Sequence, residues 1–215
     1  MKVSEIMKAP VITVTPALPV EEAFEVLRKK GIRHLPVVDD QDRLIGIISD
    51  KDLRQALVPA ERMGEEKRYF YFKNLVFVKD VMTREPLFVR PDTDVERAAY
   101  LMFTKKIGAL VVLEDRRIMG ILTRSDLLLL LIGILGMIKE GTTFLLEEDE
   151  GHKALTTAFG AVSGLGGKVL SVAVEGLEGA KRPSYKFRVE IDRGKQPELF
   201  ERLQEAGLKL GELEP

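Results

Sequence analysis

The sequence GIISDKDL at residues 46–53 and its counterpart GILTRSDL at residues 120–127 decide the fold of this chain. In each, an apolar run ends on a hydroxyl residue, and an aspartate follows three positions later: Ser49 and Asp52 in the first, Thr123 and Asp126 in the second. An apolar run that leads directly into a hydroxyl and an acidic residue is typical of a buried strand entering a helix. Two such junctions in one chain indicate a duplicated unit.

The duplication extends upstream of both junctions. When residues 5–40 are placed over residues 80–115, identical residues coincide at Met7/Met82, Val14/Val89, Pro16/Pro91, Val20/Val95, Glu21/Glu96, Ala23/Ala98, Lys30/Lys105, Ile32/Ile107, Leu35/Leu110, Val37/Val112 and Asp40/Asp115. This colinearity predicts that roughly the first 138 residues contain one unit written twice.

Each unit is predicted to be β-α-β-β-α. In the first unit, strands are expected at 11–14, 35–38 and 44–48, and in the second at 87–89, 109–113 and 118–122. A helix follows the first strand of each unit, and another follows each junction. A three-stranded sheet of this size cannot bury both of its faces alone, so the two units are expected to pack against each other.

The doubled unit resembles the cystathionine-β-synthase (CBS) domain pair, also called a Bateman module. The residues that carry the resemblance are the two junctions, together with RHLPVVD at 33–39, EIM at 5–7 and DVM at 80–82. The resemblance implies a regulatory protein that binds adenosine-type ligands in two clefts, each built from both units. AMP, ADP, ATP and S-adenosylmethionine are the candidate ligands, and no obligatory cofactor is expected.

The two junctions allow a structural and a functional interpretation. A hydroxyl and a carboxylate at this spacing can simply cap the helix that they open. The same geometry also suits a ribonucleotide, because helix N-terminal amides bind phosphate and a carboxylate accepts hydrogen bonds from ribose hydroxyls. Both interpretations stay open on the sequence alone.

Carried over by position, the resemblance divides the ligand-binding residues between two clefts. One cleft would contain Asp126, Thr123 and Ser125, with the backbone near Ile12 and Ile32 against the adenine. The other would contain Asp52, Ser49 and Lys51, with the backbone near Phe88, Ile107 and Gly108. Arg33 is expected to add a phosphate-binding cation to the Asp52 cleft, which would then bind more tightly than the Asp126 cleft.

Composition argues against catalysis and against several kinds of partner. The chain has no cysteine, its formal net charge is −1, and its two histidines, His34 and His152, lack further metal ligands at suitable spacing. No nucleophile–base pair, phosphate-binding glycine loop or metal cluster is evident, so neither a catalytic nor a metal site is expected. The near-neutral charge argues against nucleic acid and an anionic membrane as partners.

The predicted domain organisation has four parts: repeat 1 at 1–58, a linker at 59–76, repeat 2 at 77–138 and a C-terminal domain at 141–215. The linker contains the aromatic run YFYF at 69–72, which is expected to pack on the body of the protein. Stacking on nucleic-acid bases is the less favoured alternative for these aromatic residues.

The C-terminal domain is predicted to be ferredoxin-like, with the order β-α-β-β-α-β. Tyr185, Phe187 and Val189 alternate with charged residues in one of its strands. After a CBS pair, this order resembles the ACT domain, an amino-acid-sensing module, and the whole chain is similar to acetoin-utilisation-type CBS-ACT proteins. The loop at 149–151 lacks the proline of the ACT motif, which disfavours amino-acid binding.

One apolar run, residues 127–138, is too short to span a membrane and is predicted to be a helix in a homodimer interface. The start of the chain lacks an apolar secretory signal, so a cytoplasmic location is expected. The sequence therefore predicts a ligand-sensing regulatory protein that transmits nucleotide occupancy through dimer geometry to a regulated protein. The alternative is a dimerisation or amino-acid-sensing module that acts through the C-terminal domain without nucleotide.

Overall fold

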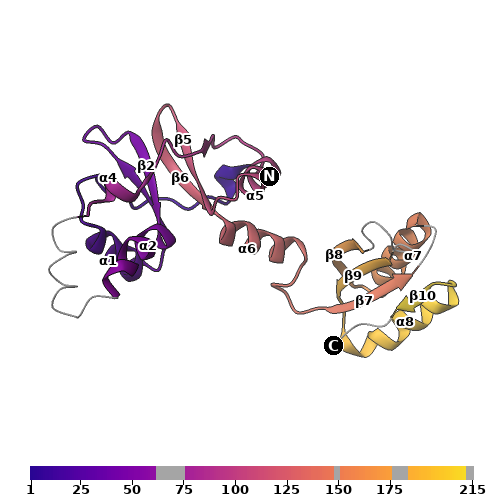
Figure 1. Ribbon diagram of the computed structural model, residues 1–215. Coiled ribbons are helices and arrows are strands. Elements are labelled where there is room, and N and C mark those ends of the chain that lie inside the picture. Colours follow the sequence, from indigo (N-terminus) through magenta and orange to yellow (C-terminus); the bar gives the residue numbers. More distant parts are fainter. Residues whose placement is uncertain (62–75, 148–150, 176–183, 212–215) are drawn as a thin grey trace. The chain divides into compact units, whose positions relative to one another are not determined.

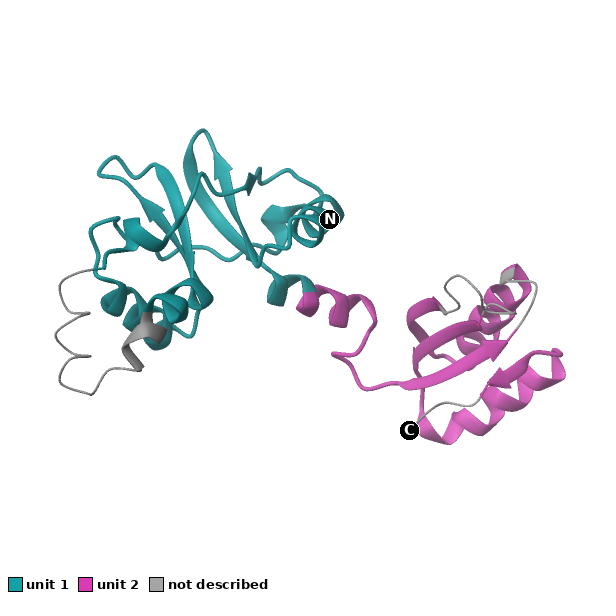
Figure 2. Cartoon of the chain, in the orientation of Figure 1, with its two compact units in different colours: residues 1–127 teal, residues 128–215 magenta. Residues whose placement is uncertain are grey.

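The computed structural model describes residues 1–61, 76–147, 151–175 and 184–211. The chain divides into two compact units, Met1–Leu127 (unit 1) and Leu128–Pro215 (unit 2), shown in different colours in Figure 2. The boundary falls within helix α6 (Arg124–Ile134). The four-part domain organisation stays a prediction, and the aromatic run of the linker lies outside the described residues.

Unit 1 contains the first predicted repeat and the second as far as Leu127 (Figure 1). The elements of repeat 1 are α1 (Val20–Lys30), β1 (His34–Val38), β2 (Leu44–Ser49) and α2 (Asp50–Glu61). Those of repeat 2 are β4 (Phe88–Val89), α5 (Val95–Thr104), β5 (Ala109–Glu114), β6 (Arg117–Thr123) and α6. As predicted, each third strand runs directly into a helix.

The duplication is visible in the core. Equivalent positions of the two repeats are buried together: Val14/Val89, Val20/Val95, Ala23/Ala98, Leu27/Met102, Leu35/Leu110, Val37/Val112 and Ile48/Leu122. These residues occupy the inner faces of the helices and strands, because the apolar positions recur with helical or strand spacing. The repeat in the sequence is therefore a repeat of the packing.

The strand predicted at 11–14 is wrong. Only Val14 pairs with β1, by donating its N–H to Pro36 O at 3.0 Å and accepting from Val38 N–H at 2.9 Å. The ladder cannot continue toward Ile12, because Pro36 has no N–H to donate. In repeat 2 the equivalent residue is Val111, and there the parallel ladder includes Phe88 and Val89 as β4.

The third strand of the first sheet comes instead from the start of repeat 2. Strand β3 (Thr83–Arg84) pairs antiparallel with β2, and the sheet order is β1-β2-β3. Reciprocally, Lys8 at the start of repeat 1 forms an antiparallel bridge with Ile121 of β6, at the edge of the sheet β4-β5-β6. Each repeat therefore completes the other's sheet.

The short helices that precede these segments are exchanged in the same way. Helix η1 (Val3–Glu5) lies against the loop before α5, and α4 (Val78–Val81) lies against the loop before α1. The matching hydrogen bonds are Val3 N–H to Thr93 O, Ser4 N–H to Pro91 O, Val78 N–H to Leu18 O and Lys79 N–H to Pro16 O, all at 2.9–3.0 Å. This reciprocal exchange ties the two repeats into one body.

Unit 2 contains the predicted order β-α-β-β-α-β. Its elements are β7 (Thr142–Glu147), α7 (Gly151–Gly164), β8 (Lys168–Glu175), β9 (Ser184–Glu190), the short helix η2 (Arg193–Lys195), α8 (Gln196–Glu205) and β10 (Lys209–Gly211). The antiparallel sheet has the order β10-β7-β9-β8. Phe144 and Phe187 stack in its core at 5.2 Å between ring centroids, and Tyr185, Phe187 and Val189 are buried as their alternation predicts.

Helix α6 is shorter than the apolar run that predicts it. It ends at Ile134, after which residues 135–138 form turns. Leu128, Leu129, Leu131 and Ile134 are each at least half exposed. In the described part of the chain, no helix is both long and apolar enough to cross a membrane.

Candidate functional site

Both strand-to-helix junctions are closed by reciprocal hydrogen bonds. Asp52 Oδ2 accepts from the Ser49 backbone N–H at 2.9 Å and from Ser49 Oγ–H at 2.6 Å, while the Asp52 N–H donates to Ser49 Oγ at 3.3 Å. The Thr123 and Asp126 pair repeats this pattern at 2.8, 2.5 and 3.4 Å. Both pairs of residues therefore cap the helices that they open. The capping hydrogen bonds use only one oxygen of each carboxylate.

The second oxygen distinguishes the two junctions. Asp126 Oδ1 lies 3.1 Å from Nζ of Lys8, and the Asp126 side chain is only 6% exposed whereas that of Lys8 is 68% exposed. The position equivalent to Lys8 in repeat 2 is Thr83, which carries no charge. Within the described residues, Asp52 forms no ion pair with its second oxygen. In the part of the chain that the structure describes, a cation therefore pairs with Asp126 and none pairs with Asp52.

A hollow of about 600 Å³ within unit 1 is lined by residues of both strand-to-helix junctions. Residues from both repeats form its walls, which is the arrangement expected of an interrepeat cleft. The lining residues are Lys8, Pro10, Val11, Ile12, Gly31, Ile32, Arg33, His34, Ser49, Asp50, Lys51, Gly108, Ile121, Thr123, Arg124 and Ser125.

The hollow is positively charged. Its lining contains four cationic side chains, Lys8, Arg33, Lys51 and Arg124, and a single carboxylate. That carboxylate, Asp50, is itself paired with Arg54, which lies outside the hollow, at 3.0 Å. Such a surface attracts an anion, and guanidinium groups bind phosphate oxygens in pairs.

The cations assigned to the two clefts lie around one hollow. Arg33 and Lys51, which the sequence assigned to the Asp52 cleft, line the hollow together with Thr123 and Ser125, and Ser49 of the Asp52 junction lines it as well. The hollow therefore borders both junctions, and the division of the ligand-binding residues between two clefts stays a prediction.

Eight of the twelve sequence-predicted ligand residues lie together in this hollow: Ile12, Ile32, Arg33, Ser49, Lys51, Gly108, Thr123 and Ser125. The other four, Asp52, Phe88, Ile107 and Asp126, do not line it. Asp126 forms an ion pair with Lys8, which lines the hollow. The Ile107 carbonyl accepts a hydrogen bond from Nε of Arg124, another lining residue, at 3.0 Å. Whether any of the twelve contacts a ligand stays a prediction.

Sequence reasoning missed Lys8, Pro10, Gly31, Asp50 and Ile121 as lining residues. Comparison of the repeats could not single out Lys8, because its counterpart Thr83 has a different chemistry. The only available signal was its place directly after the repeated Met7.

His34, which has no further metal ligand at suitable spacing in the sequence, also lines the hollow. Its ring lies over Gly108, so closely that a Cβ atom on residue 108 would come within 2.7 Å of Nε2. Burial lowers the pKa of His34 below its usual value of 6.5, with further lowering from Arg124 and Arg33, while Asp52 and Asp50 act in the opposite direction. The imidazole is therefore held in its neutral form at neutral pH. Among the described residues no group of three metal-ligating side chains comes together.

Comparison with known protein families gives a match over unit 1. The model of the CBS domain matches residues 3–59 and 78–133, which together make up just over half of the chain. A CBS domain-containing protein of Dictyostelium discoideum is 36% identical over 135 residues, which are 62% of this chain and 92% of that protein. Inosine-5'-monophosphate dehydrogenase of Methanocaldococcus jannaschii is 33% identical over 128 residues, 59% of this chain, but the aligned region spans only 23% of the enzyme.

Solved structures show the same pair of repeats. A CBS domain pair in complex with 5'-methylthioadenosine and S-adenosylmethionine has a TM-score of 0.53 and 30% identity, covering 62% of this chain and 97% of that one. The CBSX2 protein in complex with AMP has a TM-score of 0.50 and 34% identity, covering 61% and 96%. A candidate acetoin utilization protein from Vibrio cholerae has a TM-score of 0.54 and 27% identity, covering 65% and 98%.

Proposed function

Because this chain belongs to the CBS-domain family, we propose that it is a regulatory protein whose unit 1 senses an adenosine-type ligand. The observation that carries the proposal is the hollow that borders both junctions, where both repeats contribute to a positively charged lining. Relatives of known structure bind AMP in one case and S-adenosylmethionine with 5'-methylthioadenosine in another.

The arrangement suits the three parts of a nucleotide. The apolar residues Ile12 and Ile32 offer a surface for the adenine. Asp126 Oδ1, which is paired with Lys8, can accept hydrogen bonds from ribose hydroxyls once Lys8 moves aside. Phosphate would lie at the N-terminus of α6, near Arg33 and Arg124. Since the hollow is rich in cations, it favours AMP, ADP or ATP over the sulfonium ion of S-adenosylmethionine.

Calorimetric titration of the full chain with AMP, ATP and S-adenosylmethionine tests this function. Wild type is expected to bind a phosphorylated nucleotide saturably and S-adenosylmethionine more weakly. Arg33→Gln removes an exposed cation without touching a cap, so it is expected to weaken AMP binding about tenfold, the effect of one charge-assisted contact, and to leave the unfolding transition unchanged. Folded wild type that binds none of the three ligands would refute the proposal.

The equivalent aspartates provide a matched pair. Asp126→Ala and Asp52→Ala each remove one cap of the same kind, and each is expected to cost about 1 kcal/mol of stability. Only Asp126→Ala is expected to abolish nucleotide binding in this hollow. Equal loss of stability with unchanged nucleotide affinity in both variants would mean that the aspartates only cap helices.

Occupancy is transmitted through a homodimer in this proposal. The support is α6, whose Leu128, Leu129, Leu131 and Ile134 are at least half exposed, since an apolar helix surface in water favours a protein contact. Sedimentation at micromolar concentration is expected to give a dimer, and Leu129→Glu with Leu131→Glu a monomer. A monomeric wild type would exclude this route.

Unit 2 carries the alternative source of regulation. Its element order and its sheet order β10-β7-β9-β8 support an interpretation as a ferredoxin-like, ACT-type module. Amino-acid sensing through unit 2 predicts that Asp126→Ala protein still binds one member of an amino-acid panel. The loop at 149–151, which lacks the proline of the ACT motif, falls largely outside the described residues.

A further inference from the structure

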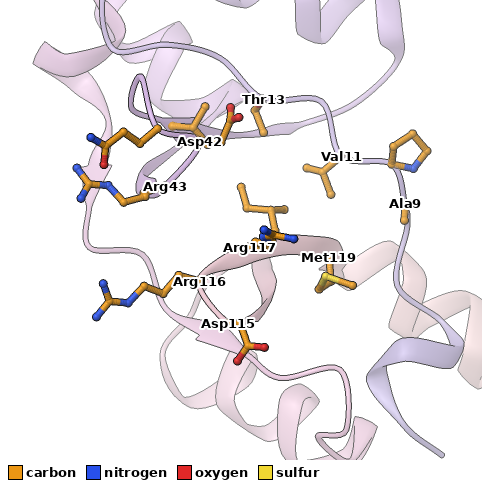
Figure 3. Close-up of a pocket in the computed structure, with 13 residues that line it drawn as sticks. Ala9, Val11, Thr13, Asp42, Arg43, Asp115, Arg116, Arg117 and Met119 are labelled. Atoms are coloured by element: carbon orange, nitrogen blue, oxygen red, sulfur yellow. The ribbon is translucent and has the colours of Figure 1, made fainter.

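Unit 1 has a second, larger hollow, of about 1060 Å³ (Figure 3). It lies between the turn that joins β1 to β2, the turn that joins β5 to β6, and the extended segment 9–13. It shares only Pro10 and Val11 with the lining of the first hollow. It is therefore a separate surface, formed at the hairpin ends of the strands rather than at the strand-to-helix junctions.

Three arginines line this second hollow. Arg43 is already engaged, since its Nε lies 2.7 Å from Asp39 Oδ2. Arg116 and Arg117 form no ion pair within the described residues. In Figure 3 Arg117 lies in the middle of the hollow, and the side chains of Arg43 and Arg116 extend outward along one edge of it from two different turns. Two guanidinium groups therefore remain available for an anion.

The backbone of the β5–β6 turn gives an independent indication. Asp115 and Arg116 both have positive φ, at 46° and 65°. A two-residue hairpin turn of this kind usually has Asn-Gly or Asp-Gly, because glycine adopts positive φ without a steric clash. Arginine at the second position is unfavourable for the hairpin itself. Residues held in such strained conformations cluster at functional sites, which points to a role for the Arg116 side chain.

The other lining residues indicate the chemistry of the rest of the ligand. Val11, Val38 and Ile118 provide an apolar surface, and Asp42 and Asp115 provide two carboxylates that accept hydrogen bonds from hydroxyl groups. The volume, about 1060 Å³, is slightly above the usual range for small-molecule sites. An arginine pair, two acceptors and an apolar wall together match an organic phosphate with hydroxyl groups on its body.

We propose that this second hollow is a binding site for a hydroxylated phosphate ester, held through Arg116 and Arg117. The site does not depend on nucleotide binding in the first hollow. A ligand here contacts the tips of both repeats and the segment between the two hollows.

Two-dimensional NMR of the full chain, titrated with glucose 6-phosphate, tests the proposal. Saturable shifts are expected at the backbone amides of Asp42, Arg116 and Arg117, and unphosphorylated glucose should cause none. Shifts confined to Arg33, Thr123 and Arg124 would place the phosphate in the first hollow and overturn the proposal. Absence of any saturable shift at the two turns would also overturn it.

Two variants separate binding from folding. Arg116→Gly supplies the residue that the turn prefers, so the thermal midpoint is expected to stay the same or rise while glucose 6-phosphate binds at least tenfold more weakly. Arg117→Gln is expected to weaken binding to a similar degree. Arg28→Gln, on exposed α1 beside Glu25, is the matched control and should change nothing. Unchanged glucose 6-phosphate affinity in Arg116→Gly and Arg117→Gln would show that neither arginine contacts the ligand, and would refute the site.

Discussion

The sulfur atom of Met82 lies directly over Gly46 of strand β2, so that a Cβ atom at residue 46 would come within 2.5 Å of it. Met7 lies over Gly120 of strand β6 in the same way. Because Met7 and Met82 are equivalent in the two repeats, as are Gly46 and Gly120, each repeat places its methionine on the glycine of the other. The two contacts fix the exchanged segments.

Gly46→Ala is therefore expected to destabilise unit 1 by about 1–3 kcal/mol, as overpacking does. Urea denaturation measures the change. The double variant Gly46→Ala with Met82→Ala should recover part of the loss, since the methyl group then has room. If the two substitutions destabilise additively, the methionine–glycine contact is not what limits the size of residue 46.

Lys8→Met tests the cation at the Asp126 junction. The substitution keeps the apolar stem of the side chain and removes the ammonium group, so AMP affinity is expected to fall about tenfold, whereas the affinity for adenosine, which has no phosphate, should change less than about threefold. Calorimetry with both ligands measures the ratio. Lys29→Met on α1, exposed and paired with Glu25, is the control. An equal loss for AMP and adenosine would show that Lys8 does not contact phosphate.

The pKa of His34 predicts a pH dependence of stability. Burial lowers this pKa in the folded protein below its value of 6.5 in the unfolded chain, so the unfolded state takes up a proton first as the pH falls. Stability should be independent of His34 above about pH 6.5 and should decline below it, by at most about 1.4 kcal/mol per pH unit, until the folded pKa is passed. Urea denaturation at pH 8, 6.5 and 5 measures this.

His34→Gln provides the comparison for that series, because it removes the titrating group and keeps a polar side chain of similar size. The difference in stability between wild type and variant should shrink as the pH falls from 6.5 to 5. A difference that is constant over this range would mean that the His34 pKa is the same in the folded and unfolded states.

Within unit 2, Arg188 of β9 anchors the turns that follow α6. Its guanidinium donates to Gly136 O at 3.0 Å, to Thr143 Oγ1 at 3.1 Å and to Lys139 O at 2.8 Å. Arg188→Met should speed amide exchange of residues 137–141 and destabilise unit 2 by about 1.5–3 kcal/mol, typical of hydrogen bonds to a charged group. Arg202→Met breaks only an exposed ion pair with Glu198 and should cost less than about 0.5 kcal/mol. Similar effects of both variants would contradict an anchoring role.

The fold of unit 1 could largely be predicted from the sequence because the two repeats can be compared with each other. Two copies of one pattern confirm strand and helix positions that either copy alone would leave ambiguous. The misplaced strand at 11–14 shows the limit of the method. The stretch is apolar and β-branched, but its pairing depends on Pro36, more than twenty residues away in the sequence.

The candidate site was predictable to the extent that it follows the repeat. Thr123, Ser125, Ile12 and Ile32 were found by position and lie together. Which cations join them depends on how the repeats pack against each other, and nothing local in the sequence encodes that distance. Arg33 and Lys51, which were assigned to the Asp52 cleft, line the same hollow as Thr123 and Ser125, and their assignment stays a prediction.

The exchange of N-terminal segments has an evolutionary consequence. A single repeat of this kind would leave one edge of its sheet unpaired and the loop before its first helix uncovered. Pairing with a second copy of itself would complete the sheet and cover the loop. The tandem chain has the form of such a self-paired ancestor joined by gene duplication and fusion. In such a fused chain the two halves can diverge. Lys8 and its equivalent Thr83, and Arg33 and its equivalent Gly108, are positions where the two repeats now differ in charge.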